Sequence, residues 1–183
     1  MAVGAAVLVA LAGCGSAAAT RPATAPPAAE AAAAAAAAYA SNQPPAAAQM
    51  VCGDEIRGEV ADALGLASLP APTSTWADHV YTCSYASAIG RLVLAVTVSP
   101  STAAARGQLQ AMRSRLDAST EEPGLGEQAY SAPVGTVLAV KDNMVLRTDA
   151  TGLPDDLGAT HERRLDLARV ITAGVFDCWA GTS

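Results

Sequence analysis

The feature that most limits what this chain can fold into is segment 15–49, which is rich in alanine and proline. Nineteen of its 35 residues are alanine, five are proline, and only Arg21 and Glu30 are charged. Because this segment lacks the large apolar side chains that build a core, we expect it to stay outside one, as a disordered tether. Its run of eight alanines favours helix, but an isolated helix of that length is marginal in water. A folded domain must therefore come from residues 50–183.

The N-terminus predicts where the protein is located. Residues 2–11 are continuously apolar, too few to span a bilayer as a helix but typical of the apolar region of a secretory signal. The next residues, Leu11-Ala12-Gly13-Cys14, resemble the lipobox of bacterial lipoproteins. The resemblance implies that residues 1–13 are a signal peptide and that Cys14 becomes the lipidated first residue. Residues 14–49 would then tether the domain to the extracytoplasmic face of the cell membrane. Since no Lys or Arg precedes the lipobox, we expect the true start codon to lie upstream.

Charge excludes two classes of partner. Apart from Arg21 and Glu30, every charged side chain lies from residue 50 onward, so the whole formal charge of -6 belongs to the domain. An acidic domain without a basic cluster is a poor ligand for the phosphates of nucleic acids and for anionic lipid headgroups. We therefore expect no nucleic-acid partner, and attachment to the membrane through the lipid anchor at Cys14.

Hydrophobic periodicity predicts a mixed α+β domain. Apolar residues recur with helical spacing in three segments, and five other segments have the composition or the alternation of strands. The expected helices are 54–64, 100–116 and 160–178, and the expected strands are 80–86, 92–98, 127–131, 136–141 and 144–149. Pro100 is expected in the first turn of the second helix, where a missing N–H is tolerated. The order helix-strand-strand-helix-strand-strand-strand-helix predicts an antiparallel sheet of about five strands with three helices packed on it.

A set of short motifs runs through the domain. It consists of Cys52, Val80-Tyr81-Thr82-Cys83-Ser84-Tyr85, Gly124-Leu125-Gly126-Glu127, Val140-Lys141-Asp142-Asn143-Met144-Val145-Leu146, Asp149-Ala150-Thr151-Gly152-Leu153-Pro154 and Cys178-Trp179. Together the motifs resemble small secreted lipoproteins of actinobacteria whose domain has no assigned function. The resemblance implies an anchored extracytoplasmic domain, related in fold to sensor domains of membrane kinases, and it assigns no chemistry to any residue.

Three cysteines remain once Cys14 is assigned to the lipid anchor. Cys52, Cys83 and Cys178 have no CxxC or other metal-ligand spacing, so a zinc site is not expected. Outside the membrane a disulfide is the default for such residues. The resemblance favours a Cys52–Cys83 bond, which leaves Cys178 as the remaining thiol. The pairs Cys52–Cys178 and Cys83–Cys178 stay open as alternatives.

The sequence holds few candidates for catalysis. Asp78 and His79 would make half of an acid–base pair, but no G-x-S-x-G nucleophile accompanies them. We therefore predict no catalytic residues, no cofactor and no metal, and a noncatalytic binding or scaffolding domain of the cell envelope. Its expected partner is an envelope protein or a small apolar ligand. The alternative is an extracytoplasmic enzyme that uses Asp78 and His79.

Overall fold

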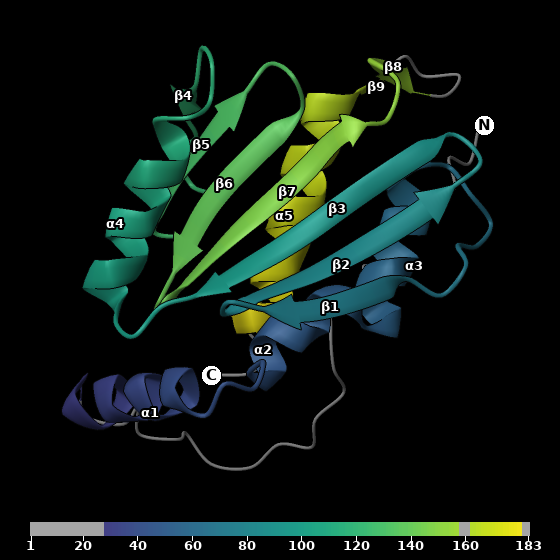
Figure 1. Ribbon diagram of the computed structural model, residues 1–183. Coiled ribbons are helices and arrows are strands. Elements are labelled where there is room, and N and C mark those ends of the chain that lie inside the picture. The colour runs from purple at the N-terminus through teal and green to yellow at the C-terminus, as the bar shows by residue number, and fades with distance from the viewer. Residues whose placement is uncertain (1–27, 158–161, 181–183) are drawn as a thin grey trace, which may run out of the picture.

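The computed structural model describes residues 28–157 and 162–180, which form an α+β domain preceded by a helix (Figure 1). The lipobox and Cys14 lie outside the described residues. The helices are α1 (Ala28–Ala40), α2 (Ala46–Gln49), the 3-10 turn η1 (Met50–Cys52), α3 (Asp54–Ala63), α4 (Thr102–Arg113) and α5 (Arg164–Ala180). The strands are β1 (Thr73–Ala77), β2 (Val80–Ser87), β3 (Gly90–Val98), β4 (Thr120–Glu121), β5 (Gln128–Ala132), β6 (Thr136–Lys141), β7 (Met144–Gly152), β8 (Asp156–Leu157) and β9 (Glu162–Arg163).

The main sheet consists of two antiparallel meanders that meet in its middle. Its strand order is β1-β2-β3-β7-β6-β5-β4, so the first meander ends on β3 and the second ends on the adjacent β7. At this junction Val96 of β3 lies opposite Leu146 of β7, and both side chains are fully buried. The two meanders are therefore joined through buried residues in the middle of the sheet. Along the chain, α4 connects the end of the first meander at β3 to the start of the second at β4.

The prediction of an α+β fold with an antiparallel sheet is confirmed, but its counts were too low. In the part of the chain that the structure describes, the main sheet has seven strands and the fold has five α-helices. The strands that sequence reasoning missed are β1 and β4, at the two edges of the sheet, and the short pair β8 and β9. β1 reads Thr-Ser-Thr-Trp-Ala and β4 has two residues, so neither shows the apolar alternation by which a strand is found.

The two faces of the sheet are covered by different helices. Figure 1 shows α5 and α3 behind the sheet, where they enclose the larger hydrophobic core. α4 covers the opposite face over β5, β6 and β7, where Leu109 packs with Leu138 and Val140 in a second, smaller core. Residues of β6 therefore alternate between the two cores, with Val137 in the first and Leu138 in the second.

Two helices begin later than the sequence predicted. α4 starts at Thr102 because Ser101, which has an extended backbone, accepts a hydrogen bond from the N–H of Ala104 at 3.2 Å and so caps the helix. Pro100 precedes that cap and is not in the first turn. α5 starts at Arg164 because the two residues before it pair with β8 as β9.

The end of the alanine-rich segment contacts the domain. Ala48 of α2 is completely buried in the main core, and the indole N–H of Trp179 donates to the carbonyl of Ala47 at 2.8 Å. Tyr39, at the end of α1, also packs against that core. The expectation that 15–49 stays outside the core therefore does not hold for Ala48. Alanine has no long side chain, which lets the backbone of α2 approach α5 closely.

Candidate functional site

A disulfide joins Cys52 of η1 to Cys83 of β2. The Sγ–Sγ distance is 1.98 Å and the Cα–Cα distance is 5.5 Å, so the pairing favoured by the family resemblance is confirmed. Cys83 is completely buried, and next to it the hydroxyl of Tyr85 donates to the carbonyl of Val51 at 2.6 Å. Together the two links hold the start of the domain against β2. Cys178 is a buried thiol in α5, 2 % exposed.

Asp78 and His79 form the two-residue turn between β1 and β2. Their φ angles are +50° and +60°, the left-handed backbone that this kind of hairpin turn requires at both positions. Asp78 is exposed. The imidazole of His79 is stacked on the ring of Tyr39, with 3.9 Å between ring centroids, and meets Trp76 edge-on at 6.0 Å. Among the residues that the structure describes, none makes a hydrogen bond to the buried Nδ1 of His79. The positive φ angles and the ring contacts give the two residues a part in a turn and an aromatic cluster.

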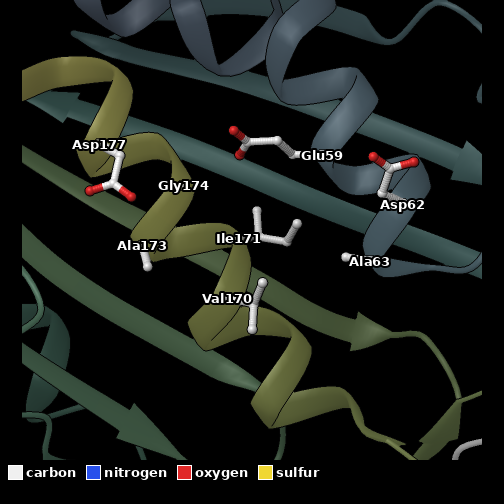
Figure 2. Close-up of a pocket in the computed structure, with 8 residues that line it drawn as sticks. All are labelled: Glu59, Asp62, Ala63, Val170, Ile171, Ala173, Gly174 and Asp177. Atoms are coloured by element: carbon white, nitrogen blue, oxygen red, sulfur yellow. The ribbon is translucent and has the colours of Figure 1, made fainter. Parts of the chain in front are cut away.

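A groove of about 440 Å³ lies between α3 and α5, a volume within the range of small-molecule sites (Figure 2). Its apolar lining includes Ile171 and Val170, and Val170 is 55 % exposed. The lining residues are Glu59, Asp62, Ala63, Val170, Ile171, Ala173, Gly174 and Asp177, and none of them is basic. We call this feature the α3–α5 groove.

Three carboxylates border the α3–α5 groove. Glu59 and Asp62 come from consecutive turns of α3, and Asp177 comes from the facing side of α5 (Figure 2). The carboxylate of Glu59 lies against Gly174, where a larger side chain would overlap it and make Glu59 move aside. Burial raises the pKa of Glu59, and repulsion from Glu55 and Asp177 raises it further. A cation in the groove would relieve that repulsion.

Sequence reasoning did not find this groove. The helical spacing of 54–64 placed Ile56 and Val60 on the core face, which left Glu59 and Asp62 as ordinary solvated positions. Nothing local in the sequence indicates that Asp177 faces them. The packing of α3 against α5 brings the three together.

The face of β1, β2 and β3 that points away from the main core is the second candidate surface. It consists of side chains that are mostly small and uncharged, namely Thr73, Thr75, Ala77, Val80, Thr82, Ser84, Ala86, Val93, Ala95 and Thr97. None of these side chains is buried, and α4 makes its main contacts further along the sheet, with β6 and β7. Arg147 and Asp149 of β7 border this face as an ion pair.

A network of charged side chains on the face of the sheet covered by α5 links the edge at β4 and β5 to that helix. Arg169 of α5 donates to Glu122 at 2.6 Å and to Asp166 at 2.7 Å, and Ser131 of β5 also donates to Glu122. Burial raises the pKa of Glu122, but the bonds from Arg169 and Ser131 outweigh it and hold that pKa below its usual value. Every member has a partner inside the network, which indicates a structural role.

Two other features of the described residues bear on function. Residues 28–157 and 162–180 contain no group of three or more His, Cys, Asp or Glu side chains arranged to hold a metal ion. None of the helices described is long and apolar enough to cross a membrane.

Comparison with known proteins gave no match, whether to a protein-family model, to a curated protein or to a solved structure.

Proposed function

We propose that this chain is a lipoprotein, anchored through Cys14 to the extracytoplasmic face of the cell membrane, whose domain is a noncatalytic binding module. Its partner is a group that carries positive charge next to an apolar surface, taken from an envelope protein. The α3–α5 groove is the binding site. The observation that carries this assignment is the combination of an apolar lining with three carboxylates and no basic residue.

The proposed location rests on the sequence and agrees with one feature of the fold. The order of apolar run, Leu11-Ala12-Gly13-Cys14 and alanine-rich tether is that of lipoprotein precursors. A disulfide such as Cys52–Cys83 persists in oxidising compartments and is uncommon in the cytosol. The described part of the tether ends against the domain at Ala47 and Ala48, so its remaining length would act as the spacer.

The proposed ligand class follows from the physical chemistry of the groove. Val170, which is 55 % exposed, offers apolar area to a hydrocarbon or an aliphatic side chain, whereas Ile171 is itself buried in the main core. Glu59, Asp62 and Asp177 would attract an ammonium or guanidinium group, and a bound cation would lower the cost of ionising Glu59. Purely apolar ligands would leave these carboxylates without compensation, so the groove favours a basic segment over the small apolar ligand expected from the sequence.

Mass spectrometry of nonreduced peptides from the membrane fraction of the host tests the anchor. We expect a peptide that begins at Cys14 and carries diacylglycerol. Recovery of an intact, unmodified peptide across residues 1–20 would contradict the lipoprotein assignment. The Cys52–Cys83 peptide in the same digest serves as an internal standard for oxidation.

Binding is tested on the full chain with two labelled model peptides, one of alternating leucine and lysine and one of alternating leucine and glutamate. We expect the basic peptide to bind and to shift the amide resonance of Gly174, and the acidic peptide to do neither. The double variant Asp62→Asn/Asp177→Asn should bind the basic peptide about tenfold more weakly, which corresponds to about 0.7 kcal/mol for each carboxylate.

The matched control is Asp117→Asn/Glu121→Gln, which removes the same charge from exposed positions that do not line the groove. This control should bind like the unmodified chain. Equal losses in both double variants would mean that net charge alone attracts the peptide, and the groove assignment would then be wrong.

A further inference from the structure

The outer side of β1 has backbone groups that no described residue satisfies. The N–H of Val98 donates to the carbonyl of His79 at 2.9 Å, which extends the ladder between β2 and β3. Because hydrogen-bonded pairs alternate along an antiparallel ladder, the N–H and C=O groups of the odd-numbered residues of β2 bond to β3. The even-numbered residues of β2 therefore bond to β1, where their partners are Thr73, Thr75 and Ala77. The N–H and C=O groups of Ser74 and Trp76 consequently point out of the sheet.

The two edges of the sheet are built differently. β4 has two residues, includes Glu121 and is followed by Glu122-Pro123, and a short, charged, proline-flanked edge resists the addition of another strand. β1 has five residues, none of them charged or proline, and all are exposed except Trp76. The indole of Trp76 is bonded to the carbonyl of Asn42, which leaves its backbone untouched. β1 thus has none of the features that protect β4.

We propose that β1 is a docking edge for a second copy of this chain, and that the two β1 strands pair antiparallel about a two-fold axis through Thr75. This pairing places Ser74 opposite Trp76 of the second copy, and Trp76 opposite Ser74 of the second copy. Each of these pairs joins residues whose N–H and C=O groups both point outward, so each pair exchanges hydrogen bonds in both directions. The two sheets become one continuous sheet, and the uncharged faces of β1, β2 and β3 lie side by side.

A second copy fits this edge because β1 is complementary to itself. The outward-pointing residues at 74 and 76 are placed symmetrically about Thr75, as an isologous interface requires. The chain carries a net charge of -6, yet β1 has no charge, so two copies meet at this strand without a like-charge pair across it. The edge also offers no charge by which a strand of another protein would be selected. This inference is independent of the α3–α5 groove, whose lining includes no residue of β1.

Disulfide trapping in membranes tests both the dimer and its register. In the proposed pairing Thr75 faces Thr75 of the second copy in a non-hydrogen-bonded pair, with about 4.5 Å between Cα atoms, which is within the range that a disulfide spans. The full-length variant Thr75→Cys, treated with a mild oxidant and run on a nonreducing gel, should therefore give a covalent dimer. Thr75 is exposed, so the substitution should not disturb the fold.

Register-specific controls use the same strand and the opposite edge. Thr73→Cys alone should give little dimer, because position 73 of the second copy lies about 13 Å away along the strand. Thr73→Cys mixed with Ala77→Cys should give a heterodimer, since these two positions face each other in the proposed register. Thr120→Cys, exposed on β4, should give none.

Ser74→Pro supplies a second, independent measurement. It removes an outward N–H but no hydrogen bond between β1 and β2, so it should abolish cross-linking of Thr75→Cys while the Cys52–Cys83 bond still forms. The proposal would be overturned by absence of the Thr75→Cys dimer, by equal trapping at Thr73 and Thr75, or by cross-linking that survives Ser74→Pro.

Discussion

Removal of the Cys52–Cys83 bond is expected to destabilise the domain through its unfolded state. The bond closes a loop with a sequence separation of 31, and the loss of loop entropy in the unfolded chain then corresponds to about 3–4 kcal/mol. The double variant Cys52→Ala/Cys83→Ala should therefore have a free energy of unfolding lower by that amount. For a domain of this size the same change lowers Tm by about 10–20 °C.

Urea unfolding followed by circular dichroism separates this mechanism from a loss of packing. Without the cross-link the unfolded chain exposes more surface, so the m-value should rise while the midpoint falls. Reduction of the unmodified protein with dithiothreitol should reproduce the variant. The variant itself should not respond to dithiothreitol, and this is the control for effects of reductant on Cys178.

Two results would refute the reasoning. A loss below about 1 kcal/mol would mean that the unfolded chain is already restricted between Cys52 and Cys83 without the bond. A large loss with an unchanged m-value would place the effect in the folded state, at the buried Cys83 side chain.

Three further predictions concern buried and charged side chains. Thr172→Val should cost about 1–3 kcal/mol in urea unfolding, because the buried hydroxyl of Thr148 loses its 2.7 Å partner; the double variant with Thr148→Val should recover part of that loss. Burial raises the pKa of Glu122, but the bonds from Arg169 and Ser131 outweigh it and hold this pKa below the usual 4.5. Glu122→Gln should therefore destabilise the domain at neutral pH, and progressively less as the pH falls below 4.5. The stabilisation is therefore lost as pH falls through the lowered pKa, and thermal melts across an acid series measure the difference. Glu59→Gln should raise Tm at neutral pH and have no such effect in acid, because burial and neighbouring carboxylates raise the pKa of Glu59 and stability falls as pH rises through it.

The hairpins of the sheet were readable from the sequence where apolar alternation is strong. Leu92, Leu94 and Val96 of β3 alternate with smaller or more polar residues, and all three are completely buried as that pattern requires. β6 and β7 were found on either side of the turn at Asp142-Asn143 in the same way.

β1 escaped the same procedure, and the reason is physical. Its five residues contain one large apolar side chain, Trp76, so no period-2 pattern is visible. The strand forms because β2 beside it offers a row of backbone groups, and because Asp78 and His79 adopt the left-handed turn that returns the chain onto it. The pair that the sequence offered as an acid and a base thus has a conformational role in the fold.

The candidate sites depended on contacts between distant segments. The disulfide was favoured by resemblance, while the sequence alone left three pairings open. The α3–α5 groove needs Glu59 and Asp177 to face each other across two helices, and the carboxylate of Glu59 lies against Gly174 of α5. No local pattern records that relation, because each residue is an ordinary position on its own helix.

The sequence by itself determined the fold class, the positions of most of the strands in the main sheet, and the acidic charge of the domain. These are properties of local periodicity and composition, which set which side of each element is apolar before any tertiary contact exists. Only the tertiary structure decided that α4 and α5 cover opposite faces, that Ala48 belongs to the core, and that β1 is the edge strand of the sheet among the described residues. A pattern of apolar residues specifies that a face must be buried, but which segment buries it depends on shape and packing between residues far apart in the chain.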